Sequence, residues 1–120
     1  MFILDGLMTP LYLDLVKFHS LRGLAGIFRR GTTGLANGNL NAWINYLPNR
    51  NPEEDVLIIQ LEIDPSRHMN LFTAWSKGVI TKEYVTNLVI PAEDDHKTVE
   101  TVFLEKRDEI LADVQKAMIK

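Results

Sequence analysis

The run DVLIIQLEI, residues 55–63, limits the possible folds of this chain more than any other stretch. Successive side chains of a strand point to opposite faces, so one face carries four large apolar residues: Leu57, Ile59, Leu61 and Ile63. The other face begins apolar and ends with Gln60 and Glu62. This pattern predicts a central strand with one face fully covered, and Asp64-Pro65 marks its end.

Length and composition predict a single globular domain spanning residues 1–120. Of the 120 residues, 46% are hydrophobic and 24% are charged, which is typical of a globular protein. A domain of this length buries roughly two-thirds of its unfolded surface, enough for one core. The formal charge of −3 disfavours a dedicated nucleic-acid binder, because neutralising phosphates requires a basic surplus. The absence of cysteine excludes disulfides and thiolate ligands.

The N-terminal run MFILDGLMTPLYLDLV is apolar, but two acidic residues, a glycine and a proline interrupt it. Because it also has no basic leader, it fits neither a signal peptide nor a membrane-spanning helix. We therefore expect a cytoplasmic protein with no membrane partner. The turn dipeptides Asp5-Gly6 and Thr9-Pro10 predict an irregular edge segment over residues 1–10.

Local patterns predict a strand and then a helix over the next twenty residues. Apolar residues alternate over residues 11–18, which favours a strand. Ser20 is a favourable N-cap, and the residues after it recur at the spacing of one helical face: Leu21, Leu24, Ala25 and Phe28. Gly31 then predicts the C-terminal cap, preceded by Arg29 and Arg30, where the helix dipole favours cations.

Residues 32–41 are rich in glycine, asparagine and threonine and predict a loop. Residues 42–47 fit either a short strand or a helical turn. Residues 66–78 predict a short helix, since Met69, Phe72 and Trp75 recur every third residue. Residues 79–90 are rich in β-branched side chains and predict one long strand or two short ones.

Acidic residues at positions 93–95 mark the start of a C-terminal helix, because a helix N-terminus favours negative charge. Apolar residues follow an approximately helical stripe from Val99 to Met118. Residues 97–104 are also compatible with a final strand. The chain therefore predicts an α+β fold, in which helices, including a long C-terminal one, flank a mixed or antiparallel sheet.

Two groups of residues are candidates for ligand binding. His19 stands where the predicted strand meets the predicted helix, so it could anchor a polar or phosphate-containing ligand or simply bond to the backbone. Arg22, Arg29 and Arg30 fit either a phosphate-binding rim or a solvated basic helix end. No histidine spacing matches a metal motif, so we predict no metal site.

Glu83 and the aromatic residues also have two interpretations each. Glu83 lies in a predicted strand, where its carboxylate could stabilise an oxocarbenium-like centre or form part of the polar face. Trp43, Tyr46 and Trp75 could stack against a planar ring, but the pattern favours packing in a core or interface for each of them.

The chain resembles ADP-ribosyltransferase-like domains of the diphtheria-toxin or PARP type, nearest to the DNA-modifying toxin group. Phe18-His19-Ser20 followed by LRGLAGIFRRG is similar to the opening strand and helix of that family. Tyr46 in AWINYLP matches the family's tyrosine near a strand. Glu83-Tyr84-Val85, running on to Pro91, is similar to its late glutamate strand.

The resemblance implies an enzyme that uses NAD and transfers ADP-ribose to a macromolecule. It implies that His19 and Ser20 hold the ribose and nicotinamide amide, that Tyr46 stacks on nicotinamide and that Glu83 supports transfer. Arg22 joins this predicted nucleotide site as a phosphate contact.

The main alternative is a small non-enzymatic phage or bacterial module that binds a protein partner, or a second copy of itself, through the C-terminal helix and exposed aromatic residues. A third possibility is an RNA-directed, toxin-like protein that uses the three arginines Arg22, Arg29 and Arg30. The acidic net charge disfavours this nucleic-acid hypothesis.

Overall fold

The computed structural model describes residues 4–34, 39–48, 57–75, 81–91 and 95–119. These residues form two helices and five strands in the following order: α1 (Leu4–Leu21), β1 (Gly26–Gly34), β2 (Leu40–Pro48), β3 (Leu57–Ile63), β4 (His68–Trp75), β5 (Thr81–Val89) and α2 (Asp95–Met118). Each strand pairs antiparallel with the next, so the sheet order is β1-β2-β3-β4-β5. The α+β prediction with a long C-terminal helix is confirmed, and the sheet is antiparallel.

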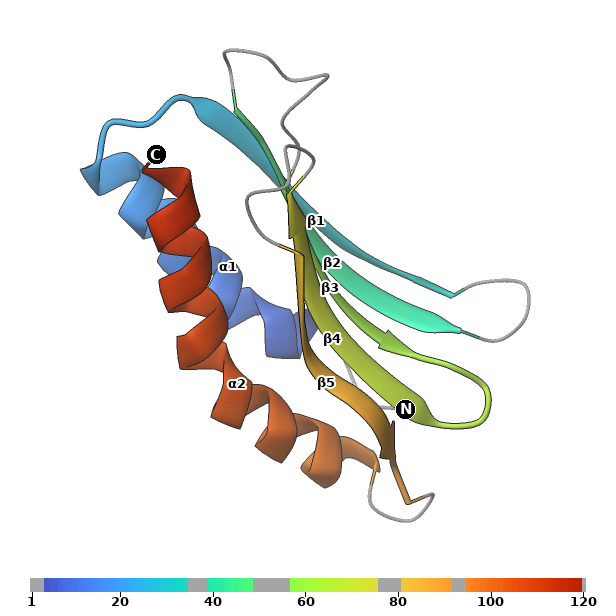
Figure 1. Ribbon diagram of the computed structural model, residues 1–120. Helices are drawn as coiled ribbons and strands as arrows, with labels where there is room; N and C mark the ends of the chain where they lie inside the picture. The colour runs from blue at the N-terminus through green and yellow to red at the C-terminus, as the bar shows by residue number, and fades with distance from the viewer. Residues whose placement is uncertain (1–3, 35–38, 49–56, 76–80, 92–94, 120) are drawn as a thin grey trace.

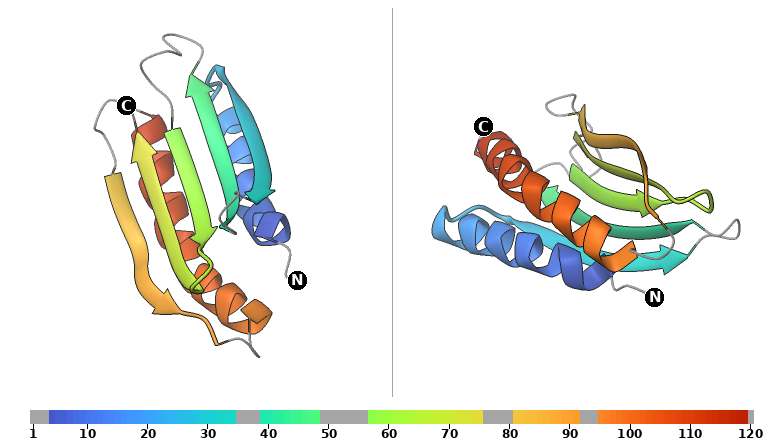
Figure 2. Two further views of the ribbon diagram at one scale, coloured as in Figure 1. Left: turned by 90° about the vertical axis from the view of Figure 1, so that its right-hand side faces the viewer. Right: turned by 90° about the horizontal axis from the view of Figure 1, so that it is seen from below.

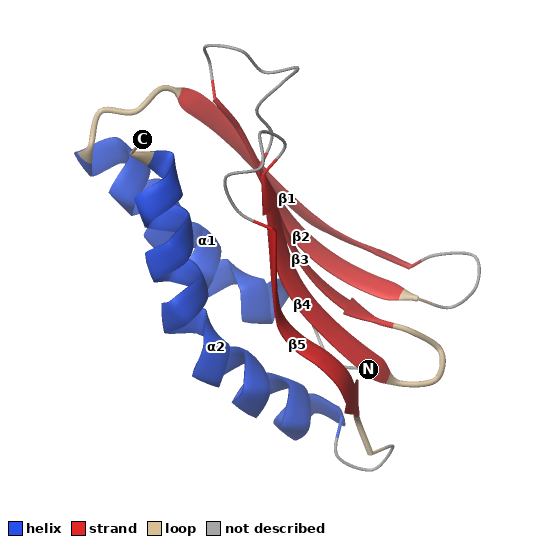
Figure 3. Cartoon of the chain, in the orientation of Figure 1, coloured by secondary structure: helices blue, strands red, loops and turns tan. Residues whose placement is uncertain are grey.

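Both helices cover the same face of the sheet, as Figures 1 and 3 show. In Figure 2 (left), α1 lies behind β1 and β2, and α2 lies behind β3 and β4. The helices run side by side in the same direction. Asp14 of α1 forms an ion pair with Arg107 of α2, and one turn later in both helices Phe18 and Leu111 line one groove. None of the described helices is long and apolar enough to cross a membrane.

The core lies between the sheet and the helix layer. The strand predicted over residues 55–63 is the middle strand β3, where buried residues alternate with half-buried ones. Its first two residues, 55 and 56, lie outside the described part of the chain. The helices contribute side chains that are less than 2% exposed: Met8, Leu11, Leu15, Val99, Phe103, Ile110 and Val114.

The predicted strand over residues 11–18 is wrong, and so is the irregular edge segment over residues 4–10, because α1 runs through both. Residues 1–3 of the predicted edge segment lie outside the described part of the chain. Met8, Leu11 and Leu15 are buried at helical spacing, whereas Leu13 is 57% exposed. The same leucines also alternate, so local spacing alone fits both structures. Packing against β1 and β2 favours the helix, which contains Pro10.

The predicted helix over residues 20–31 is also wrong, because α1 ends where we expected that helix to begin. Gly23 has a φ of 66°, a left-handed conformation that glycine adopts without strain. The Leu24 N–H donates to the His19 carbonyl oxygen (3.2 Å), and the Gly23 N–H donates to Ser20 (3.2 Å). This is the Schellman arrangement of a helix C-terminus, so Gly23 rather than Gly31 is the cap.

Of the remaining predictions of secondary structure, one is wrong, one is too long and the others agree with the structure. Residues 66–78 were expected to be helical, but residues 66–75 contain a turn and then β4, so Met69 faces the core and Phe72 the opposite face. Residues 76–78 lie outside the described part of the chain. The predicted loop 32–41 is shorter than expected, since β1 extends to Gly34 and β2 begins at Leu40, and residues 35–38 lie outside the described part. Residues 42–47 are strand and 97–104 are helix. The strand predicted over residues 79–90 is confirmed over Thr81–Val89 as the single strand β5, and residues 79 and 80 lie outside the described part.

Candidate functional site

His19 and Tyr46, two residues of the predicted nucleotide site, lie together between α1 and the sheet. The His19 ring in the last turn of α1 contacts the rings of Phe28 on β1 and Tyr46 on β2, with both centroid distances at 5.3 Å. The centroids of Phe28 and Tyr46 are 4.6 Å apart. We call His19, Phe28 and Tyr46 the aromatic cluster. Its rings pack edge to face or tilted, as aromatic pairs prefer.

The backbone around the aromatic cluster holds Tyr46 in place. Tyr46 is only 4% exposed, and its hydroxyl donates a hydrogen bond to the carbonyl oxygen of Ala25 (3.2 Å). A Cβ at Gly26 would lie 2.6 Å from the Tyr46 ring, so the ring occupies the space that a side chain would need. A nicotinamide ring could stack on Tyr46 only after displacing one of these neighbours.

The surroundings of His19 favour the neutral form of its imidazole ring. Burial lowers the pKa of its imidazole below the ordinary value of 6.5, because a desolvated ring disfavours the charged form. Its Nε2 atom is buried and has no hydrogen-bond partner among the described residues. A neutral imidazole could donate to or accept from one polar ligand atom through Nε2.

Ser20 and Arg22 lie beside this cluster but on the surface. Both are exposed at the C-terminal end of α1. The Arg22 guanidinium lies over the Phe18 ring, 5.3 Å from its centroid, rather than over the aromatic cluster. Ser20 therefore belongs to the helix end and is not its N-cap.

Glu83 lies apart from the other predicted site residues. It is on β5, three strands from Tyr46, which corresponds to about 14 Å at the usual strand spacing. Its partner on β4 is Phe72, whose neighbours Leu71 and Thr73 are buried on the helix-covered face. Glu83 therefore projects from the opposite face, where it is exposed. The structure brings together His19 and Tyr46 and leaves Glu83 outside their site.

A groove between the two helices was not predicted from the sequence. It has a volume of about 300 Å³ and is lined by Asp14, Lys17, Phe18, Leu21, Leu111 and Gln115. We call it the helix groove. Leu21 is 77% exposed, the highest value among the large apolar residues that the structure describes. The four lining residues from α1, at positions 14, 17, 18 and 21, recur at helical spacing, which was a signal for this face of the helix. The alternation of Leu11, Leu13 and Leu15 favoured a strand instead and hid that signal.

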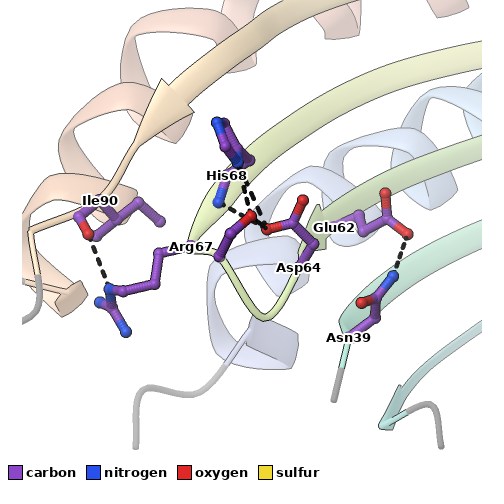
Figure 4. A network of polar contacts seen from close by, with 7 residues as sticks. Asn39, Glu62, Asp64, Arg67, His68 and Ile90 are labelled. Atoms are coloured by element: carbon purple, nitrogen blue, oxygen red, sulfur yellow. Dashed lines mark hydrogen bonds and ion pairs between the residues drawn. The ribbon is translucent and has the colours of Figure 1, made fainter. Parts of the chain in front are cut away.

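The β3–β4 turn holds an aspartate, a serine and a histidine (Figure 4). Asp64 Oδ1 accepts hydrogen bonds from Ser66 Oγ (2.8 Å) and the His68 N–H (2.9 Å), and these bonds lower the pKa of the carboxyl. His68 Nδ1 lies 2.9 Å from Ser66 Oγ and 3.7 Å from Asp64 Oδ1. A catalytic triad needs two different histidine nitrogens for these contacts, so this cluster stabilises the turn.

A polar network joins β5 to α2. Lys82 Nζ donates to Glu109 (2.8 Å) and Asp113 (2.9 Å), and the Tyr84 hydroxyl donates to Asp113 (3.0 Å). Burial raises the pKa of Tyr84 to about 12, and the hydrogen bond from Lys82 lowers the pKa of Asp113. These contacts fasten the second edge strand to the helix layer.

No three histidine, cysteine or acidic residues within the described ranges are placed to bind a metal ion. No protein-family model matches this chain, and no curated protein or solved structure is significantly similar to it.

Proposed function

We propose that this protein is a non-enzymatic interaction module that pairs with a second copy of itself through the helix groove. One observation carries this proposal: Leu21 is 77% exposed at a groove whose other apolar walls are Phe18 and Leu111. Isolated exposed leucines are ordinary, but an apolar side chain at an apolar groove is typical of an interaction surface.

The C-terminal helix takes part in this surface, but not through its central apolar stripe. Ile110 and Val114 are fully buried in the core. Leu104 is 55% exposed and lies two helical turns before Leu111 on the same side of α2. A partner would therefore contact Leu104 and Leu111 on α2 and Leu21 on α1.

The charges in the groove suit a two-fold pair. Asp14 and Lys17 lie one turn apart on α1, and both line the groove. In a two-fold interface, residue i of one copy contacts residue j of the other and the reverse. Lys17 of each copy can therefore approach Asp14 of the other, whose carboxylate also pairs with Arg107 of its own chain.

Sedimentation equilibrium of the full chain tests this proposal. We expect a concentration-dependent dimer that Leu21→Ser shifts to monomer. Leu13→Ser is the matched control, because Leu13 is 57% exposed on the same helix but does not line the groove. A wild-type protein that stays monomeric at high concentration, or an equal loss of dimer in both variants, would contradict the proposal.

Binding of NAD is a second proposal, supported by one observation. His19 and Tyr46 are 27 positions apart in the sequence, yet their rings are in contact at 5.3 Å. Titration with millimolar NAD should then shift the NMR signals of His19 and Tyr46. Transfer of ADP-ribose would need a carboxylate other than Glu83, because Glu83 projects from the other face. Unchanged spectra would remove the nucleotide hypothesis.

A further inference from the structure

β1 forms one edge of the sheet, and its pairing with β2 is regular throughout. All nine residues of Gly26–Gly34 pair with β2 without a register shift, whereas the pairing of β4 with β5 at the other edge is interrupted near Leu71. Figure 2 (left) shows no further strand of the described chain beyond β1. Alternate residues of an edge strand direct N–H and C=O groups outward, so β1 is an unbroken template for another strand.

Two adjacent arginines give this edge a positive charge. Arg29 and Arg30 are both exposed, and as consecutive strand residues they project from opposite faces. Arg30 Nη1 donates to Thr9 Oγ1 (2.7 Å), which places this guanidinium on the helix-covered face. The chain has no acidic residue between positions 15 and 52, although its net charge is −3. The β1 edge is therefore a local basic surface on an acidic protein.

Charge determines which strand can pair with this edge. Antiparallel pairing of two β1 strands would gather four arginines, and like charges on opposed strands are destabilising. A strand with acidic residues at the same positions forms opposite-charge pairs on both faces instead. The two arginines thus disfavour a second copy at this edge and favour an acidic partner.

The register of β1 also defines the partner's pattern. Ile27 is 58% exposed and lies on the same face as Arg29, two residues earlier. In an antiparallel partner strand, four consecutive residues lie opposite residues 30, 29, 28 and 27 in that order. If the first two are acidic and face Arg30 and Arg29, the fourth faces Ile27. An apolar side chain there would cover Ile27. The expected pattern is two acidic residues, any residue, and then an apolar residue.

We infer that β1 binds an extended acidic segment of a partner protein by strand addition, with the pattern acidic-acidic-any-apolar opposite Arg30 to Ile27. Main-chain hydrogen bonds provide affinity in this mode, and alternate side chains provide specificity. The β1 edge and the helix groove are separate surfaces, so this inference does not depend on self-association.

Fluorescence anisotropy with short labelled peptides tests the inference on the full chain. We expect a peptide with the acidic pattern to bind, and the amide NMR signals of residues 26–34 to shift. Arg29→Glu should weaken binding about tenfold by replacing an attractive cross-strand pair with a repulsive one. A peptide with lysine at the position opposite residue 29 should restore binding to that variant. Arg22→Glu is the control, because Arg22 is a basic residue outside β1.

Three outcomes would overturn the inference. The first is equal binding of a peptide whose backbone nitrogens are methylated, because ion pairing alone would then explain the affinity. The second is tighter binding of a single-stranded oligonucleotide, which would make the edge a nucleic-acid surface. The third is no binding of the acidic peptide to a folded protein, in which case the arginines only protect the edge from association.

Discussion

Arg67 in the β3–β4 turn donates a hydrogen bond from Nε to the carbonyl oxygen of Ile90, 2.8 Å away, beyond the end of β5 (Figure 4). The Ile90 N–H in turn donates to the Arg67 carbonyl oxygen (3.0 Å). Arg67 has a φ of 69°, the left-handed conformation that usually requires glycine. One strained residue thus fastens the hairpin turn to the end of the last strand.

Two substitutions at Arg67 distinguish the cost of its left-handed backbone conformation from the contribution of its side-chain hydrogen bonds. Arg67→Ala removes the side-chain bonds and keeps the unfavourable Cβ, so we expect the free energy of unfolding to fall by about 1–2 kcal/mol. Arg67→Gly loses the same bonds but relieves about 1–2 kcal/mol of strain, so it should remain closer to wild type. Urea denaturation followed by circular dichroism measures both. Equal effects would show that the turn stores no strain.

Alanine at two glycines should destabilise the protein to different extents. A Cβ at Gly26 would meet the Tyr46 ring at 2.6 Å, and a Cβ at Gly31 would meet Trp43 Cζ2 at 2.7 Å. Tyr46 is buried, whereas Trp43 is half-buried on the uncovered face and has room to move. We expect Gly26→Ala to reduce the free energy of unfolding by about 1–3 kcal/mol, and Gly31→Ala to reduce it less. Thermal denaturation checks the order, and the reverse order would contradict it.

Stability should fall as the pH falls below 6.5 because of His19. Burial lowers its folded-state pKa below the ordinary value of 6.5, so the unfolded chain binds the proton first. The stabilisation is complete above pH 6.5 and is lost as the pH falls towards the folded-state pKa. His19→Phe should flatten this part of the profile in urea titrations at several pH values. The pKa values of Asp64 and Asp113 are lowered from 3.8, so the stabilisation that they provide is lost mainly below pH 3.8, well below the range of His19. An unchanged profile in the variant would exclude His19 as the cause.

Tyr84 should ionise later than an ordinary tyrosine. Burial, with a further contribution from the hydrogen bond to Asp113, raises its pKa from 10.0 to about 12. The unfolded chain therefore loses this proton first, and stability should decline as the pH rises from 10 to 12. Absorbance of tyrosinate in the alkaline range measures the pKa, and Tyr84→Phe assigns the signal. Asp113→Asn should lower the pKa of Tyr84; no change would exclude Asp113 as a contributor.

The candidate site was only partly predictable from the sequence. His19 and Tyr46 were both expected at one site, and they are in contact. Glu83 is separated from them because strand order and side-chain alternation place it on another strand and another face. Leu21 was expected on the apolar face of a helix that begins after Ser20, yet it is exposed at the helix groove because α1 ends there.

The sequence by itself determined the α+β class, the central strand β3, the last strand β5 and the helical character of the C-terminus. In each of these segments, the apolar pattern fits one secondary structure over most of its length. Residues 11–18 and 66–75 fit both a helix and a strand, because residues spaced two, three or four apart are apolar in each. Only the tertiary structure decided between them. Covering β1 and β2 requires a helix over residues 11–18, and pairing between β3 and β5 requires a strand over residues 68–75.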